Sequence, residues 1–306
     1  MEIRNYLTLE NARSEELRAI LDLARAHAEG RLGSPLAGKT VCLAFFEAST
    51  RTAVSFELAA RRGGCDVISL SERGSAIAKG ESLIDTVVTL DRLGADASVL
   101  RHPSAGAATL AARHTGAAVI NAGDGCGQHP TQALLDLYSL SDALGGFDEL
   151  AGRRVVIVGD ILHSRVARSV IPAFRAAGME VALVAPRTLL PLDAGVWGLP
   201  ILSSVDEALD SWGAGVLYML RLQRERMTGA KVSSVAEYAR FYGVARRHLR
   251  DGVLVMHPGP VNRGVEIAGD VVLDGASLIP DQVSAGTHVR SAVLALATGA
   301  THEVAA

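Results

Sequence analysis

Four consecutive polar residues could bind a phosphate group. Ser49, Thr50, Arg51 and Thr52 follow an apolar run, residues 40–46, and open a stretch of helical patterning that stops at two glycines. Free backbone N–H groups at a helix start attract anions, and hydroxyl and guanidinium groups add donors there. An ordinary Ser/Thr cap beside a surface arginine is the alternative. Because four such residues follow the expected strand without interruption, a phosphate site is favoured.

Three more polar residues in the first half of the chain could face the same ligand. Arg101 follows an apolar run at residues 97–100, and ligands of open α/β sheets bind outside the carboxyl ends of strands. His129 precedes Pro130, which suits the first position of a helix, and Gln132 lies one turn further on. Taken singly, Arg101 could be a surface charge, and His129 with Gln132 a helix cap and a solvated amide. The glycine-rich segment before His129 indicates close backbone approach or a tight turn, not a dinucleotide fingerprint.

The second half of the chain carries arginines that could bind carboxylates. A strand-like run at residues 154–158 leads towards Arg165, and another at residues 215–219 leads into Arg221 and Gln223. A guanidinium can hold a carboxylate through two parallel hydrogen bonds. For Arg165, a helix-surface arginine is the alternative. The glycine spacing of a nicotinamide-binding turn is missing here, so that cofactor is not expected.

Two loops complete the set of candidates. The sequence His257-Pro258-Gly259-Pro260 follows a strand-like run and should form a rigid turn that can present carbonyl groups to a ligand. The loop with Ser75 and Lys79 is small and polar, and its composition alone favours an exposed loop.

Short β-rich runs alternate with helical patterns along the chain, which is typical of parallel α/β proteins. The expected strands are residues 40–46, 66–70, 97–100, 117–121, 154–158, 180–184, 215–219 and 253–256. The expected helices are one within residues 1–30, and residues 55–62, 82–93, 107–114, 130–144 and 288–297. We expect two parallel-sheet α/β domains with the active site in the crevice between them. They are residues 1–148, with a C-terminal helix at about 286–306 packed back on them, and residues 149–285.

The composition fits a globular protein of about two domains. The chain has 306 residues, 49% hydrophobic and 21% charged, with a net charge of −3, so binding by broad neutralisation of nucleic-acid phosphates is not expected. The three cysteines are far apart, without metal-ligand spacing. The N-terminal segment does not resemble a signal peptide, and no run reaches the roughly 18 apolar residues of a membrane span. We expect a soluble cytoplasmic protein with no metal and no cofactor.

Together, the candidates predict a site for a polyanion. Arg51, Arg101, Arg165 and Arg221 come after strands or at helix starts, so one domain is expected to hold a phosphate and the other carboxylates. No nucleophile–base pair and no pair of carboxylates stands out. Catalysis would then depend on positioning and on electrostatic stabilisation of a leaving phosphate and a developing oxyanion.

Several motifs occur together and in a fixed order: STRT with SFE, KGES, RHPSAG, NAGDGCGQHPTQALLDL, GDILHSRVARS, YMLRLQRERM and MHPGPVNRGVEI. With them the chain, from about residue 38 to residue 297, resembles the aspartate/ornithine carbamoyltransferase family. RLQRERM and HPGPVNRG point to its aspartate-specific members, because an ornithine-specific relative would carry a cysteine in a His-Cys-Leu-Pro turn. The resemblance implies transfer of the carbamoyl group of carbamoyl phosphate to L-aspartate, giving N-carbamoyl-L-aspartate and phosphate, in pyrimidine synthesis.

The resemblance also implies a role for each candidate residue. The phosphate would be held by Ser49, Thr50, Arg51 and Thr52. The carbamoyl group would be polarised by Thr50, Arg101 and His129, with Gln132 near its nitrogen. The aspartate α-carboxylate would be held by Arg165 and its β-carboxylate by Arg221 and Gln223, with backbone groups of Gly259 and Pro260 around the reacting atoms.

The same resemblance reverses the interpretation of the polar loop. Ser75, towards carbamoyl phosphate, and Lys79, towards aspartate, would reach into the site of a neighbouring subunit, so the active form would be a homotrimer with shared sites. Regulatory or dihydroorotase chains would be the candidates for a larger assembly.

The phosphate loop departs from the family pattern at two positions. Ala53 stands where a second arginine is usual, and Ala48 where proline is common. The four phosphate-contacting positions are intact, so activity is expected, while the anchoring of the loop and helix is left open. The competing interpretations are a carbamoyltransferase for another amino acceptor and a silent paralogue that acts as a scaffold.

Overall fold

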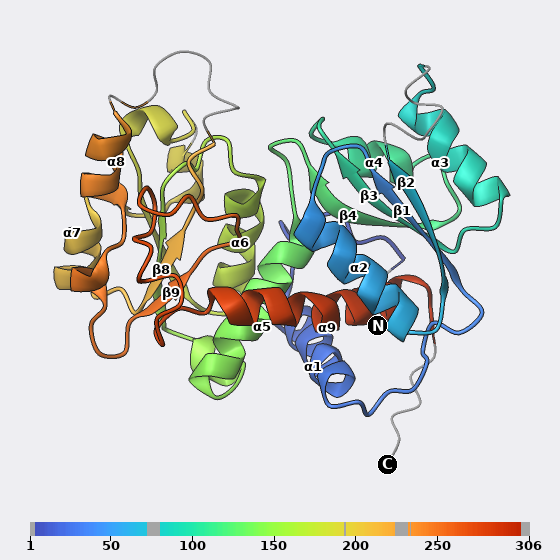
Figure 1. The fold of residues 1–306 in the computed structure, drawn as a ribbon, viewed down its shortest axis with the longest axis horizontal. Helices are drawn as coiled ribbons and strands as arrows, with labels where there is room; N and C mark the ends of the chain where they lie inside the picture. Colours follow the sequence, from blue (N-terminus) through green and yellow to red (C-terminus); the bar gives the residue numbers. More distant parts are fainter. Residues whose placement is uncertain (1–3, 72–79, 193, 224–231, 233, 301–306) are drawn as a thin grey trace. The chain divides into compact units, whose positions relative to one another are not determined.

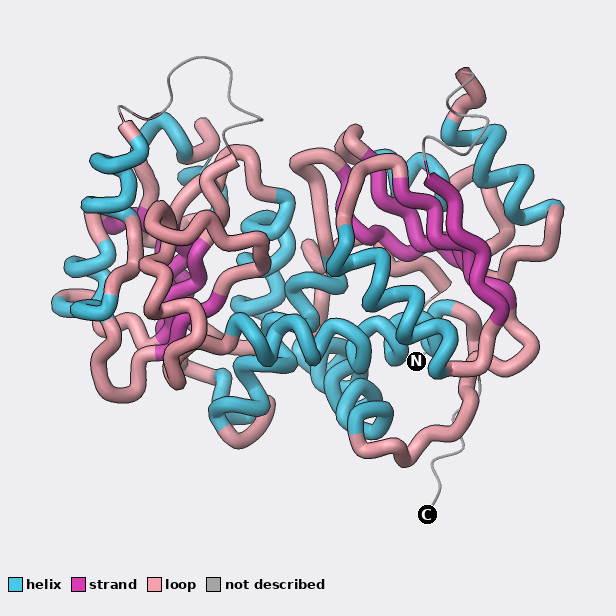
Figure 2. The backbone as a smooth tube through the Cα atoms, viewed as in Figure 1, coloured by secondary structure: helices cyan, strands magenta, loops and turns pink. Residues whose placement is uncertain are grey.

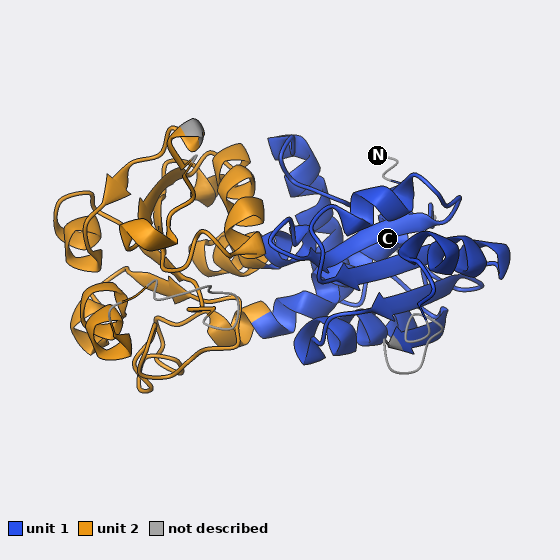
Figure 3. Ribbon diagram, turned by 90° about the horizontal axis from the view of Figure 1, so that it is seen from above, with its two compact units in different colours: residues 1–135, 283–306 blue, residues 136–282 orange. Residues whose placement is uncertain are grey.

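The computed structural model describes residues 4–71, 80–192, 194–223, 232 and 234–300. The chain divides into two compact units, Met1–Leu135 with Val283–Ala306, and Asp136–Gln282 (Figure 3). Each unit contains a parallel sheet with helices, which confirms the α/β fold class expected from the sequence. Within the described ranges, no helix is both long and apolar enough to cross a membrane.

The first unit is built on a four-stranded parallel sheet in the order β2-β1-β3-β4 (Figure 1). Its strands are β1 Thr40–Phe45, β2 Asp66–Ser71, β3 Ala97–His102 and β4 Ala118–Asp124. Four of its helices are α1 Ser14–Ala28, α2 Thr50–Arg62, α3 Leu83–Arg92 and α4 Ala107–Ala112. Val87 of α3 and Ala108 of α4 pack in one apolar cluster with Leu100 and Val119 of the sheet. Because the strands are parallel, their carboxyl ends meet at one edge, where ligands of such sheets bind.

The second unit has a five-stranded parallel sheet in the order β7-β6-β5-β8-β9. Its strands are β5 Arg154–Val158, β6 Glu180–Val184, β7 Ile201–Leu202, β8 Val216–Met219 and β9 Leu254–Met256. Its helices are α6 Arg165–Ala176, α7 Val205–Asp210 and α8 Val235–Tyr242, with short 3-10 turns η3 Asp148–Leu150, η4 Arg187–Leu189, η5 Ala194–Trp197 and η7 Arg246–His248. In both units the helices surround the strands (Figure 2).

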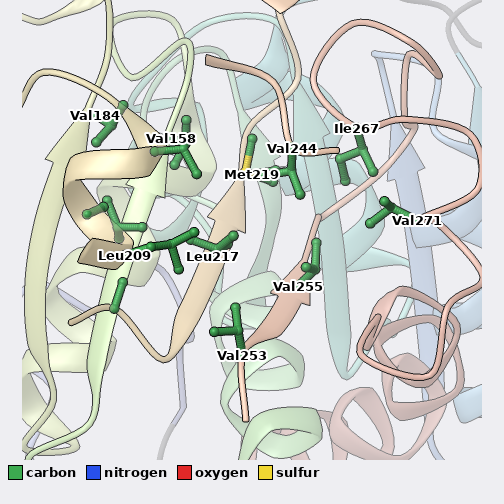
Figure 4. Packing of buried hydrophobic residues seen from close by; sticks show 14 of the residues in the cluster. Val158, Val184, Leu209, Leu217, Met219, Val244, Val253, Val255, Ile267 and Val271 are labelled. Atoms are coloured by element: carbon green, nitrogen blue, oxygen red, sulfur yellow. The ribbon is translucent and has the colours of Figure 1, made fainter. Parts of the chain in front are cut away.

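The core of the second unit consists mainly of β-branched and leucine side chains. Val158, Val184 and Leu217 come from three neighbouring strands, and Leu209 of α7 covers them (Figure 4). Central strands of parallel sheets are buried on both faces, which explains why β5 reads as an uninterrupted apolar run.

Two long helices contain the boundaries between the units. Helix α5, Pro130–Leu144, is divided after Leu135, and helix α9, Ile279–Ala297, is divided after Gln282. Both helices carry apolar residues around most of their circumference, which is typical of buried helices.

The expected strands agree with the observed ones to within three residues at either end. Helix α2 begins at Thr50, within the polar residues that were expected to open it and before the apolar range 55–62, whereas α9 begins at Ile279 rather than residue 288. In α9, polar residues in the first turns hide the start of the apolar pattern. The sequence analysis assigned no range to α6, α7, α8 or β7, and β7 spans only Ile201–Leu202.

Candidate active site

The predicted phosphate loop lies at the start of α2, directly after β1. Ser49 is the N-cap residue, in extended conformation, and its hydroxyl does not cap the helix in the described part of the chain. Thr50 and Arg51 are exposed, whereas Thr52 is buried. The first turn of α2 carries no acidic residue. The helix therefore presents its positive end, two exposed side chains and an uncommitted cap position, which favours an anion site over an ordinary cap.

Helix α2 is held from its buried side by α9. The Arg290 side chain is only 3% exposed, its Nη1 donates to Ser55 Oγ at 2.6 Å, and its guanidinium lies 5.1 Å from the centre of the Phe56 ring. Ser55 Oγ in turn donates to the carbonyl oxygen of Arg51 at 2.7 Å. Although Ala53 replaces the family's second arginine, α2 is thus anchored one turn after the phosphate loop.

Arg101 is buried at the end of β3, contrary to the surface alternative. Its side chain, 8% exposed, donates to the Ala122 carbonyl and to Glu47 Oε1, both at 3.1 Å. Arg101 is in register with Phe45 of β1, four residues before Ser49. The guanidinium and the phosphate loop therefore belong to neighbouring strand ends.

His102, the next residue, adds no positive charge at neutral pH. Its ring packs edge-on against Phe46 with centroids 6.0 Å apart, and Nδ1 accepts from the backbone N–H of Ser104. Burial lowers the pKa of His102, so the imidazole stays neutral.

His129 and Gln132 are brought to the same sheet edge by the loop that joins β4 to α5. Both are buried, and the backbone N–H of Gln132 donates to the His129 carbonyl at 3.0 Å. Asp124 holds the loop, accepting from the N–H groups of Gln128 at 2.7 Å and of Gly106 at 2.6 Å. A Cβ atom at Gly125 would lie 2.5 Å from the Ala105 nitrogen, which confirms the predicted close backbone approach.

Arg165 is the first residue of α6, directly after the loop that follows β5. It is 7% exposed, so it is not the helix-surface arginine that sequence alone left open. The start of α6 is capped by Ser164, whose hydroxyl accepts from the Ala167 N–H at 3.1 Å.

Arg221 and Gln223 follow β8, which pairs with β5 and ends beside it at Met219. Gln223 is tied to the β5–α6 loop, because its Nε2 donates to the His163 carbonyl at 3.1 Å and its N–H donates to Asp160 Oδ2 at 3.2 Å. Asp160 is fully buried and also bonds His163 Nδ1 at 2.8 Å. The predicted carboxylate-binding residues are therefore on adjacent strand ends of one sheet.

The turn His257-Pro258-Gly259-Pro260 follows β9, the next strand along this sheet edge. Gly259 has a φ of +64°, a conformation that favours glycine, and the peptide bond to Pro260 is cis. The backbone N–H of Gly259 donates to His257 Nδ1 at 2.8 Å. The rigid turn predicted from the sequence is present at the carboxyl end of a strand.

Ser75 and Lys79 lie outside the described residues. Sequence reasoning missed Glu47 and His163, which contact candidate residues, and Arg290, which supports α2. The signal for Arg290 was a lone arginine in an apolar helical stretch. In the described part of the chain, no three His, Cys, Asp or Glu residues are grouped so that they could hold a metal ion.

The fold and these residues define a class of parallel α/β protein with arginines at or just after the carboxyl ends of its strands, joined in the first unit by hydroxyl residues. Residues 4–142 match the family model for the carbamoyl-P binding domain of aspartate/ornithine carbamoyltransferase, and residues 151–297 match its Asp/Orn binding domain. The chain belongs to the aspartate/ornithine carbamoyltransferase family.

The chain is 80% identical over 306 residues, covering 100% of both chains, to the aspartate carbamoyltransferase catalytic subunit of Rubrobacter xylanophilus. Its fold is similar to that of aspartate transcarbamoylase from Trypanosoma cruzi in complex with N-(phosphonacetyl)-L-aspartic acid, at a TM-score of 0.84, 30% identity and 95% coverage of both chains. It is also similar to ornithine carbamoyltransferase from Gloeobacter violaceus, at a TM-score of 0.80, 28% identity and coverage of 97% and 99%. The fold is thus common to enzymes with both acceptors, and sequence identity carries the distinction between them.

Proposed function

We propose that this protein transfers the carbamoyl group of carbamoyl phosphate to the amino group of L-aspartate, giving N-carbamoyl-L-aspartate and phosphate. The observation that carries the proposal is the 80% identity, over the whole chain, to an aspartate carbamoyltransferase catalytic subunit. The reaction would serve pyrimidine synthesis, and we expect the protein in the cytoplasm.

The first of the two domains expected from the sequence, residues 1–148, would bind carbamoyl phosphate. Ser49, Thr50, Arg51 and Thr52 would hold the phosphate at the start of α2, where the helix presents its positive end. The buried guanidinium of Arg101 and the side chain of His129 would polarise the carbamoyl carbonyl together with Thr50. Gln132 would bind the carbamoyl nitrogen.

The second domain expected from the sequence, residues 149–285, would bind aspartate. Arg165 would hold the α-carboxylate, and Arg221 with Gln223 the β-carboxylate, because guanidinium groups bind carboxylates in a bidentate manner. The turn at Gly259 and Pro260 would supply backbone groups near the reacting atoms.

Chemistry at such a site depends on charge and position. The aspartate nitrogen bonds to the carbamoyl carbon, the carbon–oxygen bond to phosphate breaks, and the nitrogen loses a proton to the leaving phosphate. Arginine and histidine donors stabilise the oxyanion and the leaving phosphate, which is the kind of assistance that preorganised donors supply. Since carbon and nitrogen must meet, the two sets of residues would serve one site.

We further propose a homotrimer in which Ser75 and Lys79 complete a neighbour's site. Support comes from exposed apolar side chains in the first unit, namely Val54 and Leu58 of α2 and Ile68 of β2. These side chains could be covered by a second copy of the chain. A larger assembly with regulatory or dihydroorotase chains would form on such trimers.

Steady-state assays with carbamoyl phosphate and either aspartate or ornithine test the acceptor. We expect turnover when aspartate is the acceptor and none when ornithine is the acceptor. Turnover with ornithine would favour the alternative acceptor. A protein that is folded but inactive with both would support the silent-scaffold alternative. The mass in solution, measured on the same sample, tests the trimer.

A further inference from the structure

A chain of buried hydrogen bonds ends on the turn after β9. Its members are the side chains of Asp136, Tyr218 and Gln282, and the backbone and imidazole of His257, all at most 3% exposed. They come from α5, β8, the first turn of α9 and the β9 turn. The sequence predicts no role for Asp136, Tyr218 or Gln282. His257 was named only as part of the predicted turn.

The donors and acceptors of this chain follow one direction. Tyr218 O–H donates to Asp136 Oδ2 at 2.5 Å, and Gln282 Nε2 donates to Asp136 Oδ1 at 2.7 Å. Gln282 Oε1 then accepts from the backbone N–H of His257 at 3.0 Å. Because a carboxylate only accepts, Asp136 fixes which end of the Gln282 amide points at His257.

The series of hydrogen bonds continues from the His257 backbone into the turn. His257 Nδ1 accepts from the Gly259 N–H, so the imidazole carries its proton on Nε2, which faces Glu266 Oε1 at 3.4 Å. Glu266 Oε1 also accepts from the Asn262 N–H at 2.9 Å. The turn is thereby held on both sides of Gly259 and Pro260.

We propose that Gln282 is a positioning residue for carbamoyl transfer, whose side-chain amide, oriented by Asp136, fixes the backbone of the His257–Pro260 turn. This inference rests on the proposed function, because that function gives the turn its task near the reacting atoms. Gln suits the position because a single planar group must donate to a carboxylate and accept from a backbone N–H.

The decisive variant is Gln282→Met, which keeps the length of the side chain and removes both hydrogen bonds. A turn displaced by about 1 Å should lower kcat roughly tenfold to a hundredfold. The KM for aspartate should rise, whereas the KM for carbamoyl phosphate should stay within about twofold, since the first unit is unchanged. Amide hydrogen exchange at His257 and Gly259, the two residues of the turn that have a backbone N–H, should become faster than in the wild type.

A second variant, Gln282→Glu, distinguishes hydrogen bonding from packing. A neutral carboxyl can donate to Asp136 and accept from His257, as the amide does, but an ionised one cannot donate. The ionisable groups that face it are Asp136, Tyr218 and His257, with Glu266 beyond His257. Its activity relative to wild type should therefore fall as pH rises, while the ratio for Gln282→Met should stay flat.

Ser277→Ala is the matched control. Ser277 is buried just before α9, and its hydroxyl donates to the Val272 carbonyl at 2.9 Å. This hydrogen bond is not part of the series that leads from Asp136 to His257. Its kinetics and its amide exchange at His257 and Gly259 should match the wild type within about twofold.

Three results would overturn the inference. These are unchanged amide exchange at His257 and Gly259 in Gln282→Met, an equal rise of both KM values with kcat unchanged, and a flat pH ratio for Gln282→Glu at reduced activity. A wild-type protein that is inactive with aspartate would refute the proposed function. Amide exchange is measured without substrate, so it would still test whether Gln282 holds the turn.

Discussion

At the level of single residues, two of the candidate arginines are buried. Arg101 and Arg165 are both almost fully buried, and burying a charge is costly unless polar groups surround it. For Arg101, those groups include Glu47 and the Ala122 carbonyl. Such guanidinium groups are already oriented when an anion arrives, which lowers the cost of binding it.

Arg51→Ala should abolish most activity without unfolding the protein. Arg51 is exposed at the start of α2, so its loss would remove the proposed contact to the leaving phosphate without disturbing core packing. Loss of such a contact costs about 2–4 kcal/mol in the transition state. The measurement is kcat/KM for carbamoyl phosphate, with circular dichroism to verify the fold.

Arg61→Ala is the control for this variant. Arg61 lies near the other end of α2 and pairs with Glu57 at 2.9 Å on the surface, where such pairs contribute little. Its kinetics should match the wild type. If Arg51→Ala behaves like Arg61→Ala, the phosphate assignment is wrong.

Arg221→Ala should weaken aspartate binding and spare carbamoyl phosphate. The proposed bidentate contact belongs to the second substrate alone. Calorimetry of carbamoyl phosphate and kinetic titration of aspartate separate the two effects, with the exposed Arg153→Ala as the matched variant. An equal loss for both substrates would contradict the separate roles of the two units.

At the level of elements, the strand ends could be predicted from the sequence. The burial and the contacts of the side chains at those ends could not. Apolar runs in the sequence give β1, β3, β5 and β8, and the residues just after them give most of the candidate site. The burial of Arg101 and Arg165 was left open, because a strand-end arginine has the same sequence pattern whether it is buried or exposed.

The supporting residues were missed for a different reason. Arg290 bonds Ser55 across 235 positions, and Gln282 bonds Asp136 across 146. Spacing within a motif carries no information about partners so far apart. For Arg290 the remaining signal is the one arginine in the apolar part of α9, and that signal identifies no partner; Gln282, in the polar first turn, has no such signal.

Arg290→Met should destabilise the protein through α2. The change removes a charge-assisted hydrogen bond to Ser55 and a cation–π contact with Phe56. Together these contribute about 1–3 kcal/mol to the free energy of unfolding. Urea denaturation of Arg290→Met, Ser55→Ala and the double variant measures the coupling between the two side chains. Strictly additive losses would show that the contact does not stabilise α2.

At the level of the whole molecule, the proposed trimer can be tested by complementation. Mixed Lys79→Ala and Arg165→Ala chains should regain activity after subunit exchange, because some trimers then contain a site with both wild-type contributions. Each parent alone should stay inactive after the same treatment. If mass spectrometry detects mixed trimers and activity remains at the parental level, Lys79 does not act in a neighbour's site.

The divided first unit has a consequence for the order in which the protein folds during synthesis. Asp136–Gln282 is one continuous segment, whereas the first unit combines Met1–Leu135 with Val283–Ala306. The ribosome therefore releases the whole second unit before it releases Arg290, the residue that anchors α2. N-terminal domains commonly fold first, but here the unit that begins the chain is completed last. The phosphate loop should accordingly gain its final support only after α9 has left the ribosome.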